Sequence, residues 1–159
     1  MRNVCLRPAT MLPSEKIVIA VGLPGSGKST YFARLGVNAI SSDAIRLQLA
    51  DDATDQTIHG RVFATVRYLL RQRLELKRPV TYVDATNLTV KERKRYMRIA
   101  RERGCGIEAL FFDVPLEVCK ARNSARGRMV PDSAMDQMAA KLTRPAIGEG
   151  FDRVVVVNG

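Results

Sequence analysis

The sequence has few of the residues that build disulfide frameworks or metal centres. It contains one histidine, His59, and three cysteines, Cys5, Cys105 and Cys119, which are isolated and odd in number. A disulfide framework or a zinc site would need paired cysteine spacing and histidine partners. The sequence therefore predicts reduced cysteines in a cytoplasmic protein and no zinc site.

Long apolar runs are also missing. No run approaches the roughly 20 residues that span a bilayer, and residues 1–15 have no apolar core of a secretory signal. We therefore expect no membrane partner. Residues 1–15 predict a flexible N-terminal arm, in which Met11 is an alternative start, and residues 16–159 predict one domain with a continuous core. No internal repeat or interdomain linker interrupts it.

Acidic residues are outnumbered, since 26 lysines and arginines face 16 aspartates and glutamates and give a formal net charge of +10. A basic surface raises the local concentration of polyanions such as nucleic acid, nucleotides or an anionic membrane. The alternative is a charge excess that serves solubility alone. Because a small anion needs only a few cations, the excess favours a larger anion.

Hydrophobic runs alternate with helical patterns along the chain, which predicts an α/β fold with a mainly parallel sheet. We expect five strands, over residues 17–21, 38–41, 80–83, 107–114 and 154–157. An amphipathic helix follows the first strand and its Gly-rich turn. Further helices are expected over 42–49, 58–74, 89–103, 115–125 and 131–142.

The turn after the first strand matches the phosphate-binding pattern G-x-x-x-x-G-K-[ST]. Its glycines permit backbone dihedrals and close approaches that a Cβ would block, so that successive N–H groups can surround phosphates at a helix N-terminus. The lysine would reach the β- and γ-phosphates of ATP, and the serine hydroxyl would bind Mg²⁺. The residues are Gly22, Leu23, Pro24, Gly25, Ser26, Gly27, Lys28, Ser29 and Thr30.

Two aspartates follow later strands. Asp84 ends the third strand, at the sheet edge where ligands bind in open α/β sheets, and could hold Mg²⁺ or act as a turn or capping residue. Asp43 follows the second strand, with Arg46 three residues on and on the same helix face. Asp43 could orient an attacking hydroxyl and take its proton while Arg46 holds an acceptor phosphate. The spacing alone favours the simpler reading, a helix cap and a solvated charge.

Two further groups of cations stand out. Arg122, Arg126 and Arg128 precede Pro131 and predict a lid that closes over ATP, with a solvated surface run as the alternative. The helix over 89–103 is either a solvated outer face or a strip that attracts a phosphate backbone. Its cations are Lys91, Arg93, Lys94, Arg95, Arg98, Arg101 and Arg103.

With these residues in view, the chain resembles the 5′-hydroxyl polynucleotide kinases of phage and bacterial RNA repair, from about residue 16 to its end. The shared strings are G-L-P-G-S-G-K-S-T, then I-S-S-D with Arg46, D-Q-T, V-D-A-T-N, F-D-V-P and R-N-S-A-R-G with V-P. Many NTPases share the first string. The D-x-x-R and R-N-x-x-R strings together are much more selective.

The resemblance implies phosphoryl transfer from an NTP to the 5′-OH end of RNA or DNA. It implies a general base at Asp43, an acceptor-phosphate contact at Arg46, a further acceptor contact at Gln56, and lid arginines at Arg122 and Arg126. It also implies a five-stranded parallel sheet in the order 2-3-1-4-5, flanked by helices. The chain is then a stand-alone kinase, with homo-oligomers possible, or a domain fused to other end-healing domains. A kinase of a small metabolite or nucleotide sugar and a non-catalytic ATP switch are the alternatives.

Overall fold

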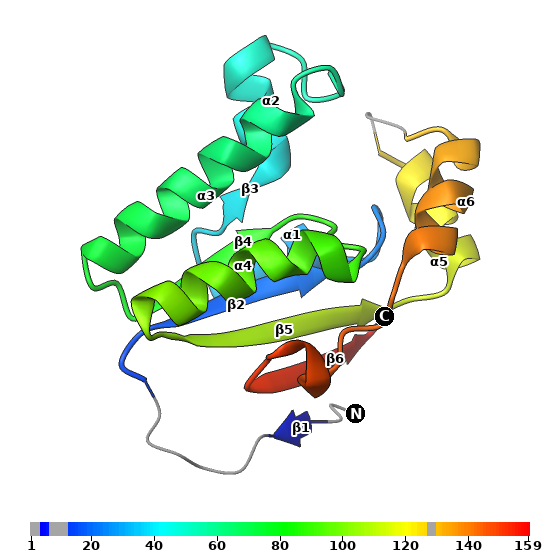
Figure 1. Cartoon of the computed structure of the whole chain (residues 1–159). Helices are drawn as coiled ribbons and strands as arrows, with labels where there is room; N and C mark the ends of the chain where they lie inside the picture. The colour runs from blue at the N-terminus through cyan, green and yellow to red at the C-terminus, as the bar shows by residue number, and fades with distance from the viewer. Residues whose placement is uncertain (1–3, 7–12, 127–129) are drawn as a thin grey trace.

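The computed structural model describes residues 4–6, 13–126 and 130–159, with side chains from residue 13 onward; Met11 and Arg128 lie outside these residues. A six-stranded sheet in the order β1-β6-β5-β2-β4-β3 forms the centre of the molecule (Figure 1). Its strands are β1 (Val4–Leu6), β2 (Lys16–Val21), β3 (Ile40–Ser41), β4 (Val80–Asp84), β5 (Gly106–Asp113) and β6 (Arg153–Asn158).

The five strands β2 to β6 are parallel, and their order is the predicted 2-3-1-4-5. The strand β1 was not predicted. It lies within the expected N-terminal arm and pairs antiparallel with β6, so that Cys5 lies opposite Val154. The sheet edge beside β6 is therefore covered by a short strand.

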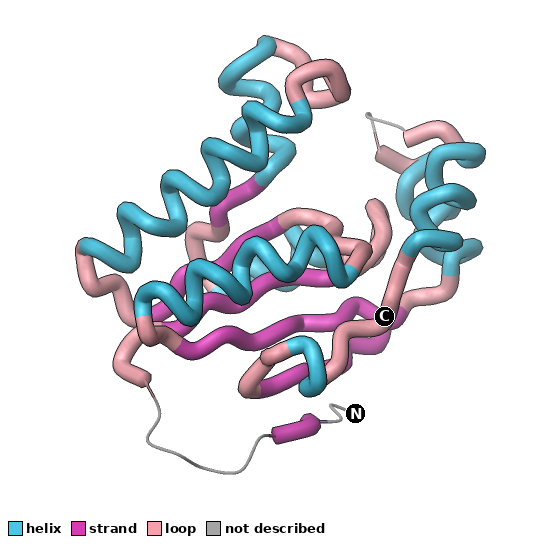
Figure 2. Tube along the Cα trace, viewed as in Figure 1, coloured by secondary structure: helices cyan, strands magenta, loops and turns pink. Residues whose placement is uncertain are grey.

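Helices connect the strands and cover both faces of the sheet (Figure 2). They are α1 (Lys28–Leu35), α2 (Ser42–Ala50), α3 (His59–Glu75), α4 (Val90–Arg103), α5 (Leu116–Ser124) and α6 (Asp132–Lys141), with a 3₁₀ helix, η1 (Ile147–Glu149). In the described part of the chain, none of them combines the length and the apolar character that crossing a bilayer requires.

The alternation along β2 explains the two layers. Ile17 and Ile19 point to the face that α3 and α4 cover, and they pack in the main core with residues such as Val66 and Ile99. Val18 points to the opposite face, in the cluster that contains the α1 residue Phe32. Because both faces are buried, the strand is a continuous apolar run, as parallel sheets require.

Helix ends match the local sequence. Ser41 caps α2, since its hydroxyl accepts a hydrogen bond from the Ala44 N–H at 3.2 Å. Thr89 and Glu92 form a reciprocal capping box at the start of α4, and Gly104 ends that helix with φ 62°. These caps place the N-termini of α2 and α4 at the carboxyl edge of the sheet, next to the Gly-rich turn.

Candidate active site

The Gly-rich turn between β2 and α1 has the shape that its sequence predicts. Gly25 and Gly27 have φ values of 80° and 95°, which side chains rarely adopt. A Cβ on Gly25 would also collide with the Cys119 carbonyl of α5, and one on Gly22 would lie 2.9 Å from the Phe112 Cβ. The turn is therefore fitted against β5 and α5 without room for side chains.

Lys28 lies in the centre of this turn. Its ammonium donates to the carbonyls of Gly22 at 3.0 Å and Leu23 at 2.7 Å, and the residue is 8% exposed. Burial lowers the pKa of Lys28 to about 8, while the carboxylates of Asp84 and Asp43 act to raise that pKa. The positive charge of Arg126 acts to lower it. Asp84, Asp43 and Arg126, from three separate segments, therefore act electrostatically on one ammonium.

Ser29 and Asp84, the two residues predicted to hold Mg²⁺, lie in hydrogen-bond contact. The Ser29 hydroxyl donates to Asp84 Oδ2 at 2.6 Å, although 55 residues separate them in the sequence. Asp84 ends β4, opposite Ser41 in the β3–β4 register, and the Ser42 hydroxyl donates to its backbone carbonyl at 3.5 Å. Hydroxyl and carboxylate oxygens are the donors that Mg²⁺ prefers, so the pair fits that ion. No cluster of three or more His, Cys, Asp or Glu metal ligands occurs among the described residues.

Asp43 and Arg46 lie in the first two turns of α2, at the same sheet edge. Arg46 Nη1 donates to Asp43 Oδ1 at 3.3 Å. The Asp43 side chain is 61% exposed while that of Arg46 is 5% exposed. Since Ser41 caps the helix, Asp43 is not its N-cap. Arg46 is not a solvated charge either, and its Nε is buried without a hydrogen-bond partner among the described residues. Such a nitrogen suits an anionic acceptor that comes from a ligand.

The lid residues that the structure describes are Arg122, on α5, and Arg126, just after it. Both are exposed and line a cavity of about 430 Å³ beside the phosphate loop. The cavity wall also includes Tyr31 of α1 and the C-terminal Asn158 and Gly159. The third predicted arginine, Arg128, is outside the described residues. A nucleotide bound to the loop would have the two described arginines on one side of it.

The structure assigns Asn123 a role that the sequence pattern did not indicate. Its amide Nδ2 donates to the Val130 carbonyl at 2.7 Å, and its Oδ1 accepts from the Val130 N–H at 3.2 Å. This two-way contact joins the ends of the segment that contains Arg126. Asn123 is 2% exposed. Its burial depends on tertiary packing, which a local pattern does not reveal.

Within the part of the chain that the structure describes, Gln56 forms no hydrogen bond with the other predicted site residues. It is exposed in the connection between α2 and α3, where its amide donates to the Thr54 carbonyl at 3.4 Å. The nearby Asp55 accepts from both the backbone N–H and the hydroxyl of Thr57. The loop is thus organised by its own turns, and an acceptor contact at Gln56 stays a prediction.

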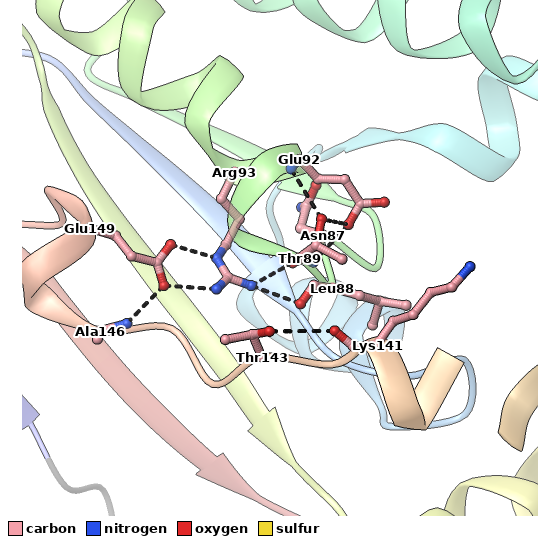
Figure 3. Close-up of polar contacts among 9 residues, drawn as sticks. All are labelled: Asn87, Leu88, Thr89, Glu92, Arg93, Lys141, Thr143, Ala146 and Glu149. Carbon is pink, nitrogen blue, oxygen red and sulfur yellow. Dashed lines mark hydrogen bonds and ion pairs between the residues drawn. The ribbon is translucent and has the colours of Figure 1, made fainter. Parts of the chain in front are cut away.

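A buried network holds the segment that follows Asp84 (Figure 3). Asn87 donates to the Ala20 carbonyl at 2.8 Å, across to β2. Arg93 donates to the carbonyls of Asn87 and Leu88, both at 3.0 Å, and binds Glu149 in two places, at 2.9 and 2.7 Å. The network therefore joins α4, η1 and the carboxyl edge of the sheet.

Arg93 was expected among the cations of an outer helix face, and that expectation was wrong because the residue is fully buried. The spacing of Arg93 along the helix could have revealed its burial. Arg93, Tyr96, Met97 and Ala100 follow the i, i+3, i+4, i+7 pattern of a core-facing stripe, and the last three are apolar and buried. A charge in such a stripe needs a buried partner, and Glu149 provides it.

Comparison with protein families adds a decisive observation to this geometry, because residues 17–145 match the family AAA_33, described as an AAA domain. The chain belongs to the AAA_33 family. Among known proteins, this AAA_33 chain is 25% identical over 143 residues to L-seryl-tRNA(Sec) kinase of Methanococcus maripaludis, covering 86% of the chain. It is 24% identical over 164 residues to the bifunctional polynucleotide phosphatase/kinase of Schizosaccharomyces pombe, covering 96% of the chain.

Solved structures share the fold of the AAA_33 domain. The chain superposes with a TM-score of 0.59 and 27% identity on a chain of the Pnkp1/Rnl/Hen1 complex, covering 79% of this chain and 43% of that one. A sugar kinase from Janibacter gives a TM-score of 0.64 at 23% identity, covering 92% and 86%. The chain spans 56% of the length of the Methanococcus relative and 36% of the yeast relative. These matches show a P-loop kinase fold.

Proposed function

We propose that this domain transfers the γ-phosphoryl group of ATP to the 5′-hydroxyl end of a polynucleotide. The observation that carries the proposal is that the carboxylate of Asp43 acts on the ammonium of Lys28. A phosphate-binding ammonium lies within electrostatic reach of Asp43, whose exposed carboxylate can meet an incoming hydroxyl. A domain that only bound ATP would not need that carboxylate.

In the proposed reaction, the backbone N–H groups of the turn and Lys28 bind the β- and γ-phosphates of ATP. Asp43 accepts the proton of the acceptor hydroxyl while the hydroxyl oxygen bonds to the γ-phosphorus. The bond from that phosphorus to the β–γ bridging oxygen breaks, and ADP leaves. Arg46 binds the phosphate next to the hydroxyl through its buried guanidinium. Ser29 and Asp84 would hold Mg²⁺, which neutralises phosphate charge.

The lid arginines complete the proposed donor site. Arg122 on α5 and Arg126 just after it line the cavity beside the phosphate loop and would add positive charge there. The Lys28 ammonium donates to two carbonyl oxygens of its own turn. A charged phosphate is a stronger acceptor than a carbonyl, so ATP would displace those contacts.

The net charge of the chain and the names of two relatives support a nucleic-acid acceptor. These two relatives are named for kinase activity, one as a polynucleotide phosphatase/kinase and one as an L-seryl-tRNA(Sec) kinase. A nucleic-acid acceptor also uses the net charge of +10, which a small neutral sugar would not. The similarity to L-seryl-tRNA(Sec) kinase favours one second candidate, an aminoacyl hydroxyl carried by RNA.

An acceptor screen with γ-labelled ATP tests the proposal. The acceptors are 5′-OH RNA and DNA oligonucleotides, seryl-tRNA, nucleosides and sugars. We expect label on the 5′-OH oligonucleotides. Label confined to seryl-tRNA would select the second candidate, and label confined to small molecules would refute both.

A variant pair tests the role of Asp43. Asp43→Asn keeps the shape but cannot take a proton, so we expect kcat to fall by roughly 10²–10⁴-fold while ATP still binds. Asp51→Asn is the matched control, because Asp51 is an exposed carboxylate at the other end of α2 and its positive φ of 55° suits asparagine. Equal activity in the two variants would remove the general base from the mechanism.

A further inference from the structure

The helices α3 and α4 lie side by side on one face of the sheet, and both begin at the edge that carries the candidate active site (Figure 1). At their far ends they are joined by an ion pair of 2.7 Å between Glu75 and Arg103. The seam between the two helices, which we call the α3–α4 seam, therefore runs from the active site toward the opposite edge of the sheet.

Three arginines line this seam. Arg67 and Arg71 are four residues apart on α3 and share one side of that helix. On α4, Arg95 shares a side with Glu92 and with Arg103, which contacts α3. Burial and then the positive charge of Arg95 lower the pKa of Arg67, and Arg71 acts in the same direction. Guanidinium groups from both helices thus face one another.

The charges in the seam are not neutralised by the protein. Across residues 13–126 and 130–159, no carboxylate forms an ion pair with Arg67, Arg71 or Arg95, although Arg93 and Arg103 of α4 each have one. Glu92, the acidic residue on the same side of α4 as Arg95, is engaged in the capping box of Thr89. Like charges held together repel each other, and a polyanion along the seam would relieve that repulsion.

An aromatic pair lies where the seam begins. His59 is exposed at the start of α3, and its ring centroid is 4.7 Å from that of Phe63 with an interplanar angle of 39°. Burial, then the charge of Arg46 and later that of Arg95, lower the pKa of His59, while Glu92 acts to raise it. These influences favour the neutral imidazole, and His59 lies within electrostatic reach of the guanidinium proposed to bind the acceptor phosphate. A neutral exposed ring next to cations is a stacking platform for a nucleobase.

We propose that the α3–α4 seam binds the single strand of the acceptor beyond its reacting 5′ end, with the first base on His59 and Phe63 and the following phosphates on Arg95 and Arg67. The inference rests on the proposed function and adds the path of the substrate. From His59 to Arg71 the helix rises about 18 Å, which matches about five nucleotides of a strand that keeps the helical rise of about 3.4 Å each.

Binding and turnover of 5′-OH oligonucleotides from one to twelve nucleotides test this path. We expect kcat/KM of the wild type to rise with length and to level off near five nucleotides. Arg67→Gln combined with Arg95→Gln should lower kcat/KM of the twelve-nucleotide acceptor at least tenfold and leave a nucleoside 3′-monophosphate unaffected. The slope of log kcat/KM against log salt should become shallower by about 1.4, since each single-strand phosphate contact contributes about 0.7.

The matched control is Lys94→Gln combined with Arg101→Gln. These two exposed cations belong to the same helix but lie seven residues apart on the flank away from α3, so the net charge changes equally. Equal loss in both double variants would overturn the path and leave only a general charge effect. A length dependence that survives Arg67→Gln and Arg95→Gln would also overturn it.

His59→Ala tests the stacking platform. We expect at least fivefold weaker binding of a normal oligonucleotide and no change for one whose first nucleotide lacks its base. Fluorescence anisotropy of labelled oligonucleotides measures both without turnover. If no acceptor were phosphorylated, the proposed function would fail, while the anisotropy comparison of the two double variants would still decide whether the seam binds a strand. Preference for an acidic peptide over an oligonucleotide would refute it.

Discussion

The buried ion pair between Arg93 and Glu149 offers the sharpest test of how the site is held. Arg93 is fully buried, the Glu149 side chain is 12% exposed, and their shortest contact is 2.7 Å. Replacing Arg93 with methionine keeps an unbranched stem as far as the position of Nε and removes the rest of the guanidinium. It leaves the Glu149 carboxylate without its cation and removes a donor from the carbonyls of Asn87 and Leu88.

Removing one partner of a buried ion pair costs about 3–5 kcal/mol, because the other charge stays buried and unpaired. For a domain whose whole stability is of the order of 5–15 kcal/mol, that is a large fraction. At roughly 2–4 °C per kcal/mol, the melting temperature of Arg93→Met should fall by roughly 6–20 °C. Urea unfolding followed by circular dichroism measures the free energy directly.

Arg103→Met is the matched control. Its ion pair with Glu75 has the same 2.7 Å contact, but the two side chains are 36% and 49% exposed. Exposed pairs contribute about 0–1 kcal/mol, so the free energy of unfolding should barely change. If Arg93→Met cost no more than Arg103→Met, burial would not be what gives this network its strength, and the reasoning would be refuted.

Three further predictions concern the phosphate loop and the lid. Gly25→Ala should abolish ATP binding in an equilibrium titration while the chain still folds, because the new Cβ would strike the Cys119 carbonyl at a φ of 80°; retained affinity would contradict the fitted turn. Lys28 has a folded pKa of about 8, below its unfolded value, so the unfolded chain holds more protons between pH 8 and about 10.5. The free energy of unfolding should therefore rise across that window by up to about 3 kcal/mol relative to Lys28→Met, and parallel curves for the two proteins would refute the assigned burial. Asn123→Ala should lose its two contacts with Val130 and raise KM for ATP several-fold with little change in KM for the acceptor; the opposite split would place Asn123 on the acceptor side.

Much of the fold was predictable because its signals are local. The apolar run of β2 feeding the Gly-rich turn predicts a strand, a loop and a helix without help from the rest of the chain. Ser41 and Thr89 predict the starts of α2 and α4 through their capping chemistry. The order of the five parallel strands came from the resemblance to a kinase family, and the structure confirms it.

The missed features depend on partners that are distant in the sequence. The strand β1 exists through its pairing with β6, almost 150 residues later, and three residues carry no periodicity of their own. Arg93 is 56 residues from Glu149, so its charge suggested a solvated face. For Asp43 and Arg46, spacing alone favoured a cap and a free charge, while the cap proved to be Ser41 and Arg46 proved to be buried.

The contact between Gly25 and α5 has a consequence for the two described lid arginines. Because the turn rests directly on the Cys119 backbone, the portion of α5 up to Arg122 forms one rigid unit with the donor anchor. Arg122 is thus set in place before any nucleotide arrives. Arg126 lies beyond the end of α5, in the segment whose two ends the Asn123–Val130 contacts join. A phosphate contact at Arg122 would then depend on nucleotide binding to the turn alone. A phosphate contact at Arg126 would depend also on the position of the segment that follows α5.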